Sequence, residues 1–127
     1  MGKTMPGKSC ILLIDDEENL RRTLAMILNR EGYQVETAAT IKEARERLEA
    51  STYDLVFLDL KLPDANGLTL LPEFQSRFPE MPVLILTAHD KLDAAVEAVR
   101  RGARDYLLKP IDPPVIIKYV KDILAEK

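Results

Sequence analysis

The stretch Ile11-Leu12-Leu13-Ile14-Asp15-Asp16 places four apolar residues directly before two adjacent carboxylates. Three later apolar runs also end on a polar residue: Leu55–Leu58 before Asp59, Val83–Leu86 before Thr87, and Tyr106–Leu108 before Lys109. Continuous apolar runs of this length are typical of parallel strands that are buried on both faces. In an open α/β sheet, the carboxyl ends of such strands form the edge that binds ligands. We therefore expect these polar side chains to meet at one edge of a sheet.

Between the apolar runs lie segments with the spacing of amphipathic helices. The first covers residues 19–30 and is followed by Gly32, which favours a helix end. A further strand is expected over residues 33–38. Four more helices are indicated by Thr40 with Glu43, by Leu71, Phe74 and Phe78, by Leu92, Val96 and Val99 after Asp90, and by Asp112-Pro113. The strict alternation predicts an α/β fold with a doubly wound, five-stranded parallel sheet and five helices.

The chain of 127 residues suits one domain with one core. We expect a disordered N-terminal tail over residues 1–8 and one folded domain over residues 9–127. The formal charge of −3 gives no long-range attraction for nucleic acid or anionic lipid. No apolar run approaches the ~20 residues that cross a bilayer, so we expect a cytoplasmic protein. The single cysteine, Cys10, excludes an internal disulfide.

Residues Gly2–Ser9 match the phosphate-loop pattern G-x-x-x-x-G-K-S letter for letter. That loop binds phosphate only between a preceding strand and a following helix, whose N-terminal amides face the phosphates. No strand precedes Gly2, and the residues after Ser9 are strand-like. The match is therefore interpreted as part of the tail.

Three carboxylates at one sheet edge, from Asp15, Asp16 and Asp59, point to a cation site. The adjacent pair could simply favour the positive end of a following helix, but helix capping leaves the third carboxylate unexplained. Hard oxygen ligands suit Mg²⁺, which keeps several waters and binds one or two carboxylates beside a phosphate. A carboxylate such as that of Asp59 can attack phosphorus and form an aspartyl phosphate. Mg²⁺ and Lys109 would neutralise the phosphoryl charge, and the Thr87 hydroxyl would donate to a phosphoryl oxygen.

Four groups of residues together resemble the receiver domain of two-component response regulators. They match that family in order and spacing over roughly residues 9–125: Asp15-Asp16, Asp59, Leu86-Thr87-Ala88 and Tyr106-Leu107-Leu108-Lys109-Pro110. The stretches 62–68 and 86–89 are similar to the NtrC-type subgroup, in which the receiver precedes an ATPase and a DNA-binding domain. The resemblance implies a flavodoxin-like strand order, 2-1-3-4-5, and a phosphorylation-switched module of a transcriptional regulator.

The resemblance implies a phosphoryl acceptor and a metal site. Asp59 would accept a phosphoryl group from a phosphohistidine on a sensor histidine kinase, with Mg²⁺ as cofactor. Asp16 and Asp59 would bind Mg²⁺ directly, and Asp15 mainly through water. Lys61, two residues after the acceptor, would contribute its backbone carbonyl.

The resemblance also implies a switch. Thr87 and Tyr106 would form the coupled switch pair, and Lys109 would be the phosphate-binding cation. A cis peptide bond is expected before Pro110. His89 is interpreted first as an exposed loop residue; in this family its position and that of Lys61 flank the path of the water that removes the phosphoryl group. The switch would act on a partner or homodimer surface formed by the fourth helix, fifth strand and fifth helix, without direct nucleic-acid or membrane contact from this domain.

Two other functions share parts of this pattern. Phosphatases of the haloacid-dehalogenase type also combine an Asp nucleophile, Thr or Ser, Lys, acidic residues and Mg²⁺. They usually place a second Asp two residues after the nucleophile, where this chain has Lys61, and they carry the acidic pair late. Flavin binding is disfavoured because Asp15-Asp16 occupies the loop where a flavin phosphate needs amides and hydroxyls. The leading hypothesis is a signalling module that catalyses only its own phosphorylation and dephosphorylation.

Overall fold

A parallel five-stranded sheet forms the centre of the protein. The computed structural model describes residues 8–88 and 92–126. The strands are β1 (Cys10–Ile14), β2 (Gln34–Ala38), β3 (Leu55–Leu58), β4 (Val83–Thr87) and β5 (Asp105–Leu108). Their order in the sheet is β2-β1-β3-β4-β5. This order and the parallel direction of every pair confirm the predicted doubly wound fold.

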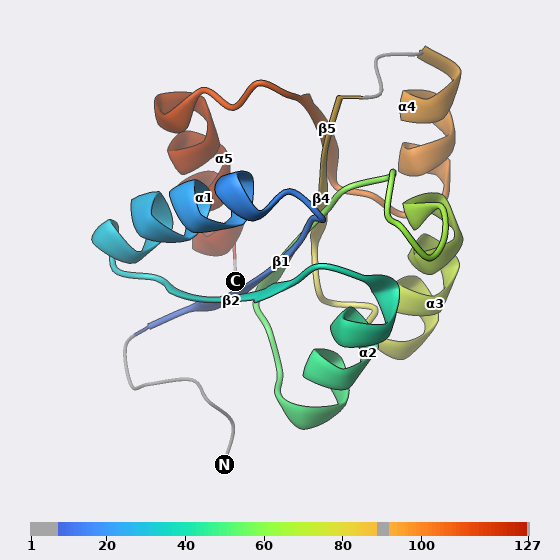
Figure 1. Cartoon of the computed structure of the whole chain (residues 1–127), viewed down its shortest axis with the longest axis horizontal. Coiled ribbons are helices and arrows are strands. Elements are labelled where there is room, and N and C mark those ends of the chain that lie inside the picture. Colours follow the sequence, from blue (N-terminus) through green and yellow to red (C-terminus); the bar gives the residue numbers. More distant parts are fainter. Residues whose placement is uncertain (1–7, 89–91, 127) are drawn as a thin grey trace.

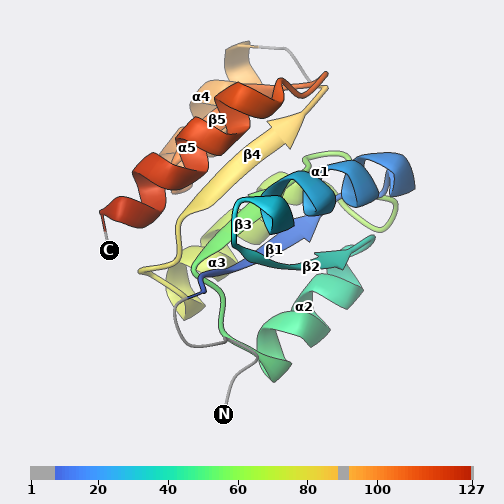
Figure 2. The same cartoon turned by 90° about the vertical axis from the view of Figure 1, so that its left-hand side faces the viewer.

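Helices cover both faces of the sheet. They are α1 (Glu18–Arg30), α2 (Ile41–Ala50), α3 (Leu70–Arg77), α4 (Leu92–Arg100) and α5 (Pro113–Ala125), with a short 3₁₀ helix, η1 (Gly67–Thr69), before α3. Helices α1 and α5 lie on one face, and α2, α3 and α4 lie on the other (Figures 1 and 2). The strands therefore need apolar side chains on both faces, which is why their sequences are continuous apolar runs.

Alternate residues of each central strand enter different cores. In β1, Leu12 and Ile14 pack towards α2 and α3, whereas Ile11 and Leu13 pack towards α1 and α5. All residues of β1, β3 and β4 are buried. The edge strands β2 and β5 are mostly half-buried, and their sequences accordingly mix polar and apolar residues.

Local sequence signals set several helix ends. The Thr40 hydroxyl caps α2 by accepting a hydrogen bond from the Glu43 N–H at 3.1 Å, and the Glu43 carboxylate accepts one from the Ala39 N–H at 2.6 Å. Gly32, with a φ of 96°, follows α1 in the left-handed conformation that favours glycine. These observations confirm the predicted start of α2 and end of α1.

Phe78, expected to mark the third helix, lies outside it, whereas Val96 and Val99 lie on α4 as expected but are exposed. Phe78 lies after the last residue of α3, where it packs edge-to-face on Phe74 with ring centroids 6.4 Å apart. Among the α4 side chains that the structure describes, those of Ala94 and Ala98 are buried in the core, whereas Val96 and Val99 are 44% and 55% exposed. The two valines therefore form an apolar surface.

Some expectations lie outside the described residues. They concern most of the predicted tail, with the phosphate-loop match, and the loop residues His89 and Asp90. Within the described ranges, no helix is long and apolar enough to cross a membrane.

Candidate functional site

The polar residues that follow the strands meet at the carboxyl edge of the sheet. Asp15 extends β1 by donating its N–H to the Ala38 carbonyl at 3.0 Å, and Asp59 extends β3 by donating to the Ile14 carbonyl at 2.9 Å. At the other side, the Lys109 N–H donates to the carbonyl of Thr87 at 2.9 Å. These backbone bonds continue the sheet by one residue at each strand end. They bring together side chains that are separated by up to 94 positions in the sequence.

The Lys109 ammonium lies among three carboxylates. Its Nζ is 2.8 Å from Asp15 Oδ2 and 3.2 Å from Asp59 Oδ2, and it also pairs with the carboxylate of Glu17. One oxygen from each of Asp15, Glu17 and Asp59 lies within 4.8 Å of the others. Three negative charges around one ammonium leave this group, the Lys109 cluster, with an excess of two negative charges.

Burial strengthens the electrostatics of the Lys109 cluster. Asp15 is 1% exposed and Asp59 is 4% exposed. Burial raises the pKa of Asp15, and the nearby charge of Asp59 adds to this effect; hydrogen bonds from Lys109 and from the Glu17 N–H oppose it. Burial alone would lower the pKa of Lys109, but its hydrogen bonds with Asp15 and Glu17 and the charges of Asp15 and Asp59 outweigh burial and raise it. The ammonium is therefore held firmly in its charged form.

The donor set fits a hard divalent cation. Asp15 Oδ2 is buried, and the Lys109 ammonium lies 2.8 Å from it. A buried carboxylate oxygen with an available lone pair, beside a second buried carboxylate and an excess of negative charge, is what Mg²⁺ binds. Asp15 and Asp59 would hold such an ion.

Glu17 is the third carboxylate of the cluster, although the sequence interpretation did not name it as a site residue. Asp15 Oδ1 accepts a hydrogen bond from the Glu17 N–H at 2.9 Å, and this turn brings the Glu17 carboxylate to Lys109. Asp16 is exposed and is not a member of the three-carboxylate group. Glu17 lies in a run of four acidic residues, Asp15–Glu18, but the spacing alone could not select which of them faces Lys109.

Lys61, Thr87 and Tyr106 flank the cluster in different ways. The Lys61 N–H donates to Asp59 Oδ1 at 3.2 Å, which fixes the acceptor carboxylate, while the Lys61 residue as a whole is exposed. Thr87, at the end of β4, is fully buried. Tyr106 pairs with Ile85 across β4 and β5 and packs partly buried against the core. The Lys109–Pro110 peptide bond is cis, as the resemblance implied.

A glycine lets the loop after β3 fold against Asp59. A Cβ on Gly67 would lie 2.4 Å from the Asp59 carbonyl oxygen and 3.0 Å from Leu60 Cα, so no other residue fits without a backbone shift. In the same loop, the Asp64 carboxylate accepts hydrogen bonds from the N–H groups of Ile41 at 3.0 Å and Lys42 at 3.2 Å. The first of these bonds lowers the pKa of Asp64.

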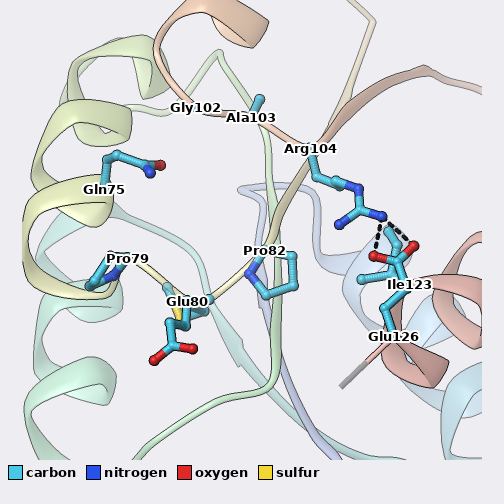
Figure 3. A pocket seen from close by; sticks show the side chains of 10 residues that line it. Gln75, Pro79, Glu80, Pro82, Gly102, Ala103, Arg104, Ile123 and Glu126 are labelled. Carbon is cyan, nitrogen blue, oxygen red and sulfur yellow. Dashed lines mark hydrogen bonds and ion pairs between the residues drawn. The ribbon is translucent and has the colours of Figure 1, made fainter.

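The amino edge of the sheet carries structural polar groups. Asp54 Oδ2 accepts a hydrogen bond from the Cys10 N–H at 2.8 Å and so joins the starts of β3 and β1. Figure 3 shows a cavity of about 480 Å³ at this edge, where Arg104 and Glu126 form an ion pair. The cavity beside the Lys109 cluster, of about 530 Å³, lies instead between the start of α1 and the loop after β5, and Glu17 and Lys109 line it.

Comparisons with known proteins agree with this geometry. The model of the response regulator receiver domain family matches residues 11–121. AlgB of Pseudomonas putida, an alginate biosynthesis transcriptional regulatory protein, is 46% identical over 113 residues, which are 89% of this chain and 25% of AlgB. The DNA-binding transcriptional regulator NtrC of Proteus hauseri is 36% identical over 105 residues, 83% of this chain and 22% of NtrC. The chain thus spans about a quarter of the length of these curated relatives.

Solved structures share the fold over most of the chain. A two-component response regulator from Clostridium difficile has a TM-score of 0.90 at 28% identity and covers 93% of this chain and 97% of its own. The beryllofluoride-activated NtrC4 receiver domain dimer has a TM-score of 0.88 at 31% identity and covers 92% of this chain and 97% of its own. The chain therefore belongs to the response regulator receiver domain family of two-component systems, with relatives among the NtrC-type transcriptional regulators.

Proposed function

We propose that this chain is a phosphorylation-switched receiver in which Asp59 accepts a phosphoryl group from a phosphohistidine of a sensor kinase. The observation that carries the proposal is the Lys109 cluster, in which an ammonium bridges two buried carboxylates at the carboxyl edge of the sheet. A purely structural ion pair needs one carboxylate. The excess of negative charge favours a site that binds a further cation.

The transfer exchanges one bond to phosphorus for another. An Asp59 carboxylate oxygen attacks the phosphorus, the P–N bond of the phosphohistidine breaks, and its electron pair stays on the imidazole nitrogen. Lys109 lies 3.2 Å from Asp59 Oδ2, so its ammonium is in place to bind a phosphoryl oxygen. The cavity beside Glu17 and Lys109 gives a donor side chain access to this edge.

Mg²⁺ would be the cofactor, as the resemblance implies, with Asp16 and Asp59 as direct ligands, Asp15 binding mainly through water, and the Lys61 backbone carbonyl completing the protein ligands. When bound, it would neutralise the charge that the phosphoryl group brings. The chain's own contribution is to hold Asp59 rigidly: Lys61 donates to Asp59 Oδ1, and the loop at Gly67 packs against the Asp59 backbone.

The switch would run through Thr87 and Tyr106. Thr87 is buried at the end of β4, where its hydroxyl would donate to a phosphoryl oxygen, and Tyr106 lies beside β4 in the strand pairing. The partner surface would be the α4-β5-α5 face, where each element carries an exposed apolar residue: Val96 and Val99 on α4, Leu108 on β5 and Val115 on α5. A homodimer through this face, in the cytoplasm, would pass the signal to a transcriptional output without nucleic-acid contact from this domain.

Phosphorylation with a small donor tests the proposal. Acetyl phosphate and Mg²⁺ should add one acid-labile phosphoryl group, detected by intact-mass spectrometry, and Asp59→Asn should remove it. Asp122→Asn is the matched control because Asp122 lies on the exposed surface paired with Lys118, remote from the sheet edge. Labelling that persists in Asp59→Asn, or that disappears in Asp122→Asn, would contradict the assignment. Steady turnover of a generic phosphate ester would favour the phosphatase alternative instead.

A further inference from the structure

Glu17 occupies a helix-capping position but does not cap its helix. It is the residue before α1, with extended backbone angles, and its side chain makes no capping hydrogen bond. Residues at this position usually accept a bond from an N–H of the first turn. The Glu17 carboxylate instead pairs with Lys109, 92 residues further along the chain. Its position is therefore not explained by the local stability of α1.

Glu17 differs from the other two partners of Lys109 in its exposure. The side chains of Asp15 and Asp59 are 1% and 5% exposed, whereas that of Glu17 is 59% exposed. The two buried carboxylates are fixed by backbone hydrogen bonds from Glu17 and Lys61. The Glu17 carboxylate is the one partner of Lys109 in this cluster that can turn into solvent without leaving a buried charge unpaired.

We propose that Glu17 is a positioning residue that competes with the phosphoryl group for the Lys109 ammonium. The inference rests on the proposed function, in which Lys109 binds a phosphoryl oxygen. In the unphosphorylated protein, Glu17 supplies one of the three contacts of the ammonium. A phosphoryl group on Asp59 adds negative charge within the same cluster and takes a contact of the Lys109 ammonium. The Glu17 carboxylate must then move away from Lys109, and its negative charge disfavours the phosphorylated state. Glu17 thereby sets how strongly the unphosphorylated form is favoured.

The neighbouring Glu18 provides a matched control. It is also a glutamate, lies one residue further along, and pairs with Arg22 at 2.8 Å on the exposed surface of α1. Glu17→Gln and Glu18→Gln remove the same charge from the same turn. Only the first variant removes a contact with Lys109.

Affinity for beryllofluoride, a phosphoryl analogue, measures the competition. Each protein is titrated by calorimetry at its own saturating Mg²⁺ concentration, so that altered metal affinity does not enter the comparison. Glu17→Gln should bind beryllofluoride about two- to fivefold more tightly than wild type, the range for a partly exposed ion pair. Glu18→Gln should match wild type. In the metal-free protein, the side-chain ¹⁵N resonance of Lys109 should shift in Glu17→Gln and not in Glu18→Gln.

Unchanged or weaker beryllofluoride binding by Glu17→Gln would overturn the competition, and so would an equal gain in Glu18→Gln. These results would leave the proposed function standing, because the wild type would still bind the analogue. Failure of wild type to bind beryllofluoride at saturating Mg²⁺ would overturn the proposed function and this inference together.

Discussion

Replacing Asp59 by Asn should stabilise the metal-free protein, because the Lys109 cluster holds more negative charge than its ammonium can neutralise. The variant keeps the shape of the side chain and removes one charge. An amide oxygen can still accept the Lys61 N–H, which is 3.2 Å from Asp59 Oδ1. The substitution therefore tests the electrostatics of the cluster with little change in packing.

The pair energies nearly cancel. With an effective dielectric constant of about 20, Coulomb's law gives about 5 kcal/mol of attraction between Asp59 and Lys109 at 3.2 Å. It gives about 3.5 kcal/mol of repulsion from Asp15 at the 4.8 Å limit of their separation. Glu17 adds repulsion of about 1–2 kcal/mol once solvent screening of its exposed side chain is included. The sum of the pair energies is close to zero.

The cost of burial then decides the sign. Asp59 is 4% exposed, and burying a carboxylate costs several kcal/mol more than burying an amide of the same shape. Part of this cost is recovered in hydrogen bonds, so we expect Asp59→Asn to raise the free energy of unfolding by about 1–3 kcal/mol in EDTA. Saturating Mg²⁺ should shrink or reverse the gain, because a ligand stabilises only the fold that binds it.

Urea denaturation of both proteins, first in EDTA and then in Mg²⁺, measures the two differences. Equal stability of wild type and Asp59→Asn in EDTA would mean that the three carboxylates do not act on one another as the geometry indicates. If Mg²⁺ raised the free energy of unfolding of both proteins equally, the assignment of Asp59 as a Mg²⁺ ligand would be refuted.

Three further changes test other parts of the fold and site. Thr87→Ala should accept a phosphoryl group but lose phosphate-dependent dimerisation, because the hydroxyl that senses the phosphoryl oxygen is gone; sedimentation of the beryllofluoride-treated variant as a dimer would refute this. Gly67→Ala should lower the free energy of unfolding by about 1–3 kcal/mol and slow phosphorylation, because its Cβ would lie 2.4 Å from the Asp59 carbonyl oxygen; wild-type values in urea denaturation and in labelling would contradict the close approach. Asp64→Ala should cost about 1 kcal/mol, because it removes hydrogen bonds to the first turn of α2. The pKa of Asp64 is lowered on folding, so its contribution to the free energy of unfolding is present above the unfolded pKa near 3.8 and is lost as pH falls through the folded pKa. A stability difference between wild type and variant that does not shrink in acid would show that the ionised carboxylate does not stabilise the first turn of α2.

The strands and the edge that gathers the polar residues could be predicted from the sequence. A run such as Leu55–Leu58 has no polar position, so both of its faces must be covered, and this requires helices on each side of a parallel sheet. Once the strands are parallel, residues that directly follow them share an edge whatever their separation in sequence. Asp15, Asp59 and Lys109 follow from that geometry alone.

The contact between Glu17 and Lys109 could not be predicted in the same way. It depends on one hydrogen bond, from the Glu17 N–H to Asp15 Oδ1, which sets the turn between β1 and α1. Residue spacing contains no information about the direction of that turn. The exposure of Val96 could not be predicted from the apolar spacing of α4 either. A helix that packs through small alanines has the same apolar period as one that packs through valines.

The backbone links the residues proposed to bind the phosphoryl group to the residue proposed to report it. The Lys109 N–H donates to the Thr87 carbonyl at 2.9 Å, so the ends of β4 and β5 are joined at the site itself. Tyr106 lies three residues before Lys109 on β5 and pairs with Ile85, two residues before Thr87. A phosphoryl group that draws both the Thr87 hydroxyl and the Lys109 ammonium towards Asp59 would therefore act on two strand ends that a backbone hydrogen bond joins. Because β5 lies between α4 and α5 in the proposed partner face, Tyr106 is already part of that face. A change at the site would reach the partner surface without passing through the core.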